Sequence, residues 1–75
     1  MQTFDILLGA TDDVRRFVNL SNRYAFSIAL RQDRALIDAK SLLGILSLDL
    51  TKPITVEVYS SHCQEFLDEL AAYAP

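Results

Sequence analysis

The sequence has little of what a disulfide-linked or exported protein needs. Cys63 is the only cysteine among the 75 residues, so no disulfide can form within the chain, and a reducing compartment is expected. No apolar run is long enough to cross a membrane, and residues 1–5 lack the basic start of a signal peptide. We therefore expect a cytoplasmic protein.

The sequence also has few residues that break helices and strands. The chain holds two glycines and two prolines, and it shows no internal repeat, linker or low-complexity stretch. Apolar residues make up 51% of the sequence, which is enough for a packed core. A chain of this length has room for one core, so we predict a single domain over residues 1–75.

Positive charge is sparse and scattered. Seven lysines and arginines stand against ten aspartates and glutamates, and among the basic residues only Arg15 and Arg16 are adjacent. Nucleic-acid-binding domains usually carry a clustered basic face, which this sequence lacks. The composition favours a protein partner over a nucleic acid or a membrane.

Alternating apolar and polar residues predict four strands. Residues 25–31 and 54–59 alternate cleanly, and Gln32-Asp33 predicts a turn after the first of these segments. A short returning strand follows that turn, which indicates a hairpin. The predicted strands cover residues 2–8, 25–31, 34–38 and 54–59.

Three helices are predicted between and after the strands, one starting at Thr11, one over 41–48 and one starting at Ser61. Thr11 can cap the first helix, and Asp12 and Asp13 suit the positive end of its dipole. Ser61 and Gln64 have the spacing of a capping box. The residues expected to face the core are Val14, Phe17, Val18 and Ser21 in the first helix and Cys63, Phe66, Leu67, Leu70 and Ala74 in the last.

In chain order these elements read β-α-β-β-α-β-α. Each strand has one apolar face that needs cover, and amphipathic helices on one side of a sheet provide it. We predict an α+β open-faced sandwich, in which three helices cover one side of a four-stranded antiparallel sheet and water meets the other.

One segment carries a resemblance to a known family. Residues 39–50 read Ala-Lys-Ser-Leu-Leu-Gly-Ile-Leu-Ser-Leu-Asp-Leu. They resemble the regulatory-serine motif of HPr, the histidine-containing phosphocarrier of the bacterial sugar phosphotransferase system, as found in low-GC Gram-positive bacteria. That motif is lysine-serine, two large apolar residues, glycine, two apolar residues, serine and leucine, and the sequence fits it throughout. Phe17-Val18 and residues 67–73 are also similar to the family, so the resemblance implies an HPr-like fold for the whole chain.

The family's other motif is missing. In its phosphocarriers, the loop before the first helix holds a glycine, a phosphoacceptor histidine, an arginine and a proline; the imidazole is the nucleophile, and helix amides with the arginine hold the phosphoryl group. Here the corresponding stretch consists of Gly9, Ala10, Thr11, Asp12 and Asp13. Two like unit charges about 4 Å apart repel by roughly 4 kcal/mol near a protein surface. We predict that this loop cannot carry phosphate.

Ser41 is the residue that the resemblance singles out. It implies phosphorylation of Ser41 by the ATP-dependent kinase that modifies HPr serine. A phosphate at the start of a helix is electrostatically favourable. From the residues alone, an ordinary serine at a helix start is the alternative, because serine is common there.

The second predicted helix carries four large apolar residues, which are Leu42, Leu43, Ile45 and Leu46. They cannot all face inward, so we expect Leu46 with either Leu42 or Leu43 on the inner face and the others exposed. The resemblance implies that this patch docks enzyme I, the serine kinase and the catabolite-control repressor, and we place Arg15 and Arg16 in the same partner-binding surface. Ordinary surface leucines are the alternative.

His62 and Cys63 are the remaining candidates. His62 is either a relocated phosphoacceptor or a solvated residue at the start of the last helix, where the family shows no phosphate chemistry. Cys63 lies on the apolar stripe, which indicates a core residue. Neighbouring side chains on a helix diverge, so the two form neither a catalytic pair nor a metal site, and we predict no metal and no cofactor.

Three functions stay open on the sequence. The first is a non-enzymatic regulatory HPr variant that binds phosphotransferase or catabolite-control partners and is regulated at Ser41, similar to the catabolite-repression variant of the family. The second is a phosphocarrier that uses His62, and the third is a structural or assembly module without phosphate chemistry. The intact serine motif beside an altered histidine loop favours the first.

Overall fold

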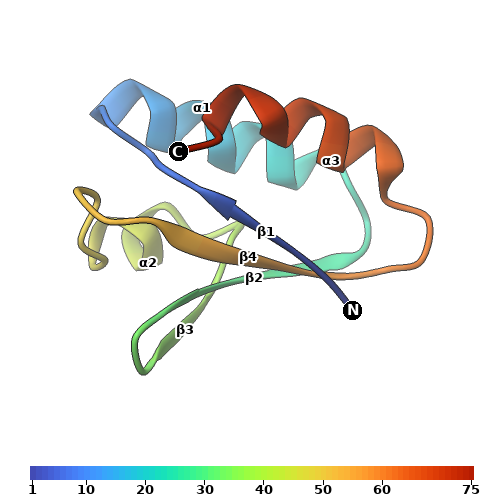
Figure 1. The fold of residues 1–75 in the computed structure, drawn as a ribbon, viewed down its shortest axis with the longest axis horizontal. Helices are drawn as coiled ribbons and strands as arrows, with labels where there is room; N and C mark the ends of the chain where they lie inside the picture. The colour runs from blue at the N-terminus through green and yellow to red at the C-terminus, as the bar shows by residue number, and fades with distance from the viewer.

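Four strands and three helices follow one another in the predicted order (Figure 1). The computed structural model describes residues 1–75. The strands are β1 (Gln2–Ile6), β2 (Ser27–Gln32), β3 (Ala35–Asp38) and β4 (Ile54–Tyr59), and the helices are α1 (Thr11–Asn22), α2 (Leu42–Leu46) and α3 (Gln64–Leu70). A 3₁₀ turn, η1 (Ala71–Tyr73), extends α3. None of the helices has the length and apolarity of a membrane span.

The strands form one antiparallel sheet in the order β1-β4-β2-β3. β4 therefore lies between the first strand and the β2–β3 hairpin. Its register places Val56 opposite Phe4 on one side and Leu30 on the other. Opposed residues of neighbouring strands point to the same face, so these apolar side chains line one side of the sheet.

All three helices contribute to one core on that face. Phe17 of α1, Ile45 of α2 and Phe66 of α3 are fully buried in the same apolar cluster. Figure 1 shows α1 and α3 side by side along the sheet, with α2 set well apart from α3. The predicted open-faced α+β sandwich is confirmed.

Some element ends differ from the predicted ones. β1 ends at Ile6 rather than Leu8, which is buried after the chain has left the sheet. β2 continues through Gln32, so the hairpin turn is formed by Asp33 and Arg34, one residue later than predicted. Asp33 has a φ of 54°, a left-handed conformation that aspartate tolerates better than most residues.

Candidate functional site

The start of α1 has no side-chain cap. Ala10 is the N-cap residue, with an extended backbone (φ −140°, ψ 157°), and no side chain accepts a hydrogen bond from the first turn. The Ala10 carbonyl already accepts from the amides of Asp13 (3.0 Å) and Val14 (3.3 Å). Thr11 is therefore the first helical residue, and the prediction that Thr11 caps the helix is wrong.

The first turn of α1 is acidic. Asp12 and Asp13 both lie in it, and no basic residue does. Asp13 is the more enclosed of the two and forms a long ion pair with Arg16, whose Nη1 lies 4.0 Å from Asp13 Oδ1. The two carboxylates thus occupy the positive end of the helix dipole, in the stretch with Gly9 and Ala10 that corresponds, by the resemblance, to the phosphocarrier loop.

His62 lies elsewhere, in the loop between β4 and α3. Figure 1 shows that loop at the opposite end of the molecule from the start of α1. The imidazole is exposed, with Nδ1 3.0 Å from the Ser61 hydroxyl, and the His62 amide donates to Ser60 Oγ. The N-cap residue of α3 is the buried Cys63, and no side chain caps the helix. The capping box predicted for Ser61 and Gln64 is therefore wrong, because the Ser61 hydroxyl lies beside the imidazole instead.

The start of α2, in contrast, has a serine cap. Ser41 precedes the helix with an extended backbone, and its Oγ accepts a hydrogen bond of 3.1 Å from the Gly44 amide. The Ser41 carbonyl accepts from the Ile45 amide at 3.1 Å. α2 ends at Leu46 rather than residue 48, because the chain closes there into a tight turn with the Ser47 amide bonded to the Gly44 carbonyl.

Gly44 leaves the space that the Ser41 side chain occupies. A Cβ at Gly44 would lie 3.2 Å from Ser41 Oγ, 3.4 Å from Ser41 Cβ and 3.6 Å from the Cβ of Ile37 in β3. The first of these distances is closer than ordinary van der Waals contact. The glycine of the motif therefore lets the Ser41 side chain fold back over the first turn, while the distance to Ile37 is an ordinary van der Waals contact.

Of the four apolar residues in α2, only Ile45 is buried. Leu42, Leu43 and Leu46 are 42%, 81% and 46% exposed, whereas Ile45 is fully enclosed. The prediction that Leu46 faces inward with Leu42 or Leu43 is wrong, because Ile45 and Leu48, three residues apart, are the pair that enters the core. Ile45 cannot touch a partner directly. The exposed set of Leu42, Leu43 and Leu46 is called the leucine patch below.

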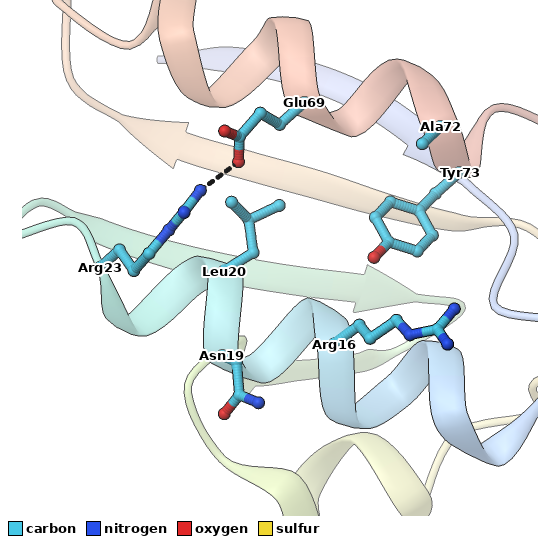
Figure 2. A pocket seen from close by; sticks show the side chains of 7 residues that line it. All are labelled: Arg16, Asn19, Leu20, Arg23, Glu69, Ala72 and Tyr73. Carbon is cyan, nitrogen blue, oxygen red and sulfur yellow. Dashed lines mark hydrogen bonds and ion pairs between the residues drawn. The ribbon is translucent and has the colours of Figure 1, made fainter.

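Arg15 and Arg16 are both exposed on α1, but the structure gives Arg16 a different neighbourhood from the leucine patch. Arg16 lines a groove of about 320 Å³ between α1 and the C-terminal segment, together with Asn19, Leu20, Arg23, Glu69, Ala72 and Tyr73 (Figure 2). Arg23 and Glu69 form an ion pair across this groove. None of the lining residues comes from α2, so the groove does not include the leucine patch.

Sequence reasoning missed a polar network on the uncovered face of the sheet. The Glu57 side chain is only 8% exposed there, because Arg31 and Tyr59 lie over it. Arg31 Nε donates to Glu57 Oε2 at 2.7 Å and the Tyr59 hydroxyl donates to Oε1 at 2.8 Å; these bonds, that of Arg31 first, lower the pKa of Glu57. The alternation of residues 54–59 puts Glu57 and Tyr59 on the face opposite Val56 and Val58, but only the register of β2 on β4 brings Arg31 to them.

The fold and the serine segment define a class of protein. Residues 13–74 match the family described as "PTS HPr component phosphorylation site". The chain therefore belongs to the HPr family. The match begins at Asp13 and does not include the stretch from Gly9 to Asp12, where the sequence departs from the phosphocarriers.

A particular relative within that family is the HPr-like protein Crh of Bacillus subtilis (strain 168). It is 34% identical over an alignment of 59 residues, and the alignment covers 76% of this chain and 69% of the relative. The Crh crystal structure, described as an intertwined dimer with a swapped domain, superposes with a TM-score of 0.69 at 29% identity, covering 93% of this chain and 82% of that one.

Two further solved structures share the fold. The phosphocarrier protein HPr of Bacillus anthracis str. Ames superposes with a TM-score of 0.76 at 26% identity, over 99% of this chain and 96% of that one. HPr-C-His of Thermoanaerobacter tengcongensis gives 0.80 at 19% identity, over 96% and 89% of the two chains. The similar structures thus include one described as a phosphocarrier as well as Crh, which is described as a catabolite-repression protein.

Proposed function

We propose that this HPr-family protein is a non-enzymatic regulatory module of the cytoplasm, which docks protein partners through the leucine patch and is switched by phosphorylation of Ser41. One observation carries the proposal: the complete serine motif forms a capped helix with exposed leucines, while the start of α1 has two carboxylates and no histidine. The likeness to Crh supports it, because Crh is named as an HPr-like protein of catabolite repression.

The local chemistry of α2 suits a phosphate on Ser41. The first turn of α2 contains no acidic residue, and Ser41 Oγ already accepts from the Gly44 amide. A phosphoserine adds a charge of about −1.5 to −2 and accepts stronger, charge-assisted hydrogen bonds at the same place. The helix can therefore keep its conformation while the charge beside the leucine patch changes.

The partners we propose are those that the family docks through this helix: the HPr serine kinase, the catabolite-control repressor and an enzyme I-like protein. Three exposed leucines on one short helix are an apolar surface of the kind that protein interfaces cover. The phosphate then selects among partners by adding negative charge at the edge of this surface.

Intact mass after incubation with HPr serine kinase and ATP tests the switch. We expect one phosphate on the wild type, none on Ser41→Ala, and one on Ser47→Ala, a matched control in the same motif at the other end of α2. No addition to the wild type would remove phosphorylation from the proposal.

Binding of the phosphorylated protein to the catabolite-control repressor tests the docking surface. Leu43→Asp should weaken binding by about tenfold or more, as expected for a residue central to an interface. Leu36→Asp replaces another exposed leucine, on β3, and should leave binding unchanged. Equal losses of binding affinity in the two variants would contradict the leucine patch as the docking surface. If the protein binds no partner at all, the structural or assembly module is favoured.

Phosphocarrier activity has its own test. With enzyme I and phosphoenolpyruvate we expect no acid-labile phosphate on this chain, because the start of α1 offers carboxylates where the family has histidine and arginine. An adduct that is lost in His62→Ala would instead establish His62 as a relocated acceptor.

A further inference from the structure

Lys40, the neighbour of Ser41, is bound to a distant part of the chain. Its Nζ donates to the carbonyl of Tyr24 at 2.7 Å and to the carbonyl of Phe26 at 3.0 Å, both in partly buried positions. These carbonyls belong to the connection between α1 and β2. The ammonium therefore joins the start of α2 to the segment that follows α1.

The segment on which Lys40 is anchored is itself well packed. The rings of Tyr24 and Phe26 stack with centroids 5.1 Å apart, and each meets Phe66 of α3 edge-on, at 5.1 and 5.9 Å. At the other end of the link, the Lys40 amide donates to Asp38 Oδ1 at 2.9 Å. Lys40 thus connects a packed aromatic cluster to the end of β3.

α2 needs such an anchor because it is short. Five residues are far fewer than an isolated helix requires in water, and only Ile45 among them is buried. Hydrogen bonds from an ammonium group to carbonyls are stronger than those between neutral groups. Two of them hold the residue that precedes the Ser41 cap. They act beside two backbone bonds, from the Ala39 amide to the Ile28 carbonyl at 3.0 Å and from the Ser41 amide to the Asp38 carbonyl at 3.1 Å.

We propose that Lys40 is a positioning residue for Ser41: its ammonium holds the start of α2 on the connection between α1 and β2, so that Ser41 and the leucine patch are presented in one fixed geometry. In this role the Lys40 ammonium binds backbone carbonyls of the fold and does not bind the kinase or the phosphate. The link to phosphorylation rests on the proposed function, whereas the positioning of α2 does not.

Acylation of the wild-type protein tests the anchor directly. The chain has only two lysines, and Lys52 is exposed with a long ion pair of 3.9 Å to Asp49. With limiting N-hydroxysuccinimidyl acetate and peptide mass spectrometry, Lys40 should react about tenfold or more slowly than Lys52, since it must first leave its two carbonyls. Equal rates at the two lysines would overturn the proposal.

Hydrogen exchange tests the positioning without any partner. The amides of Gly44 and Ile45 donate to Ser41, so their exchange reports whether the first turn of α2 is formed. Lys40→Met keeps the aliphatic stem but removes the ammonium, and it should speed exchange of both amides several-fold, while Lys52→Met should not. Unchanged exchange in Lys40→Met would also overturn the proposal.

Kinase kinetics then distinguish positioning from direct recognition. Lys40→Met should raise KM and leave kcat near the wild-type value, because the kinase binds only molecules in which the start of α2 is formed. Trimethylamine N-oxide favours the folded segment and should restore KM, and Lys40→Arg should rescue it in part. A rise in KM that the osmolyte leaves unchanged would show direct contact with the kinase and contradict positioning. If the kinase does not phosphorylate the wild-type protein, the proposed function fails. The acylation and hydrogen-exchange experiments still test the positioning role of Lys40.

Discussion

The starts of α1 and α2 stabilise the same kind of helix end in opposite ways. Each has free amides and the positive end of a helix dipole. α1 has two carboxylates in its first turn and no side-chain cap, whereas α2 has the Ser41 cap and no acidic residue. The two helices also differ in burial, since α2 has five residues and buries only Ile45, while the twelve residues of α1 bury Val14, Phe17, Leu20 and Ser21.

This contrast predicts which substitutions each helix tolerates. Burial holds α1 along its length, so the charge at its start can change without loss of the helix. α2 buries only one of its own five side chains, so its cap, its glycine and its lysine anchor matter more. Four sets of substitutions test this comparison, from the largest expected effect to the smallest.

Ile45→Ala should have the largest effect. Removing a fully buried isoleucine side chain costs about 2–5 kcal/mol of unfolding free energy, because a cavity is left in the core. Leu43→Ala, in the same helix but exposed, should change it by no more than about 0.5 kcal/mol. Urea unfolding monitored by circular dichroism measures both, and similar losses in the two variants would contradict the assignment of Ile45 to the core.

The buried face of α2 could not be predicted from the sequence because the helix is short. Four apolar residues in one and a half turns fit more than one inward face, so periodicity did not single out Ile45. β4 shows the opposite case: six residues alternate from Ile54 to Tyr59 after Pro53, and both ends of the strand are as predicted. A pattern repeated three times fixes a face, and a pattern seen once does not.

Ser41→Ala should follow in size. It removes the hydrogen bond to the Gly44 amide and should cost about 1 kcal/mol of unfolding free energy. Thr11→Ala is the matched substitution at α1 and should cost close to nothing, since no side chain caps that helix. Thermal or urea unfolding of both variants measures the difference, and an equal loss at Thr11 would show a cap there.

Residue type predicted the wrong cap at α1 because capping depends on where the chain turns. Thr11 has a favourable side chain, but Ala10 has the extended backbone of an N-cap residue. The anchor of Lys40 was missed for a related reason: its partners are the backbone carbonyls of Tyr24 and Phe26, and no local pattern marks such groups as partners. The serine motif could be recognised from the sequence because its residues are contiguous.

Ala10→Ser should give a gain of stability. The backbone at Ala10 already has the extended conformation that a capping serine adopts, and the amides of the first turn have no side-chain acceptor. A new hydroxyl there should add about 0.5–1 kcal/mol to the unfolding free energy. A loss in urea unfolding experiments would mean that the residue before α1 cannot accept a side chain.

Asp12→Asn should have the smallest effect and is the one that salt can tune. Asp12 is exposed in the first turn of α1, where a carboxylate near the dipole contributes about 0.3–1 kcal/mol at low ionic strength. The Debye length falls from about 10 Å at 0.1 M salt to about 3 Å at 1 M, so the difference between Asp12→Asn and wild type should shrink as salt rises. Asp33→Asn, at the hairpin turn and away from any helix start, is the control and should show no such dependence. If Asp12→Asn stabilises the protein at low salt, the repulsion between Asp12 and Asp13 outweighs their attraction to the helix dipole. The two carboxylates together would then destabilise α1.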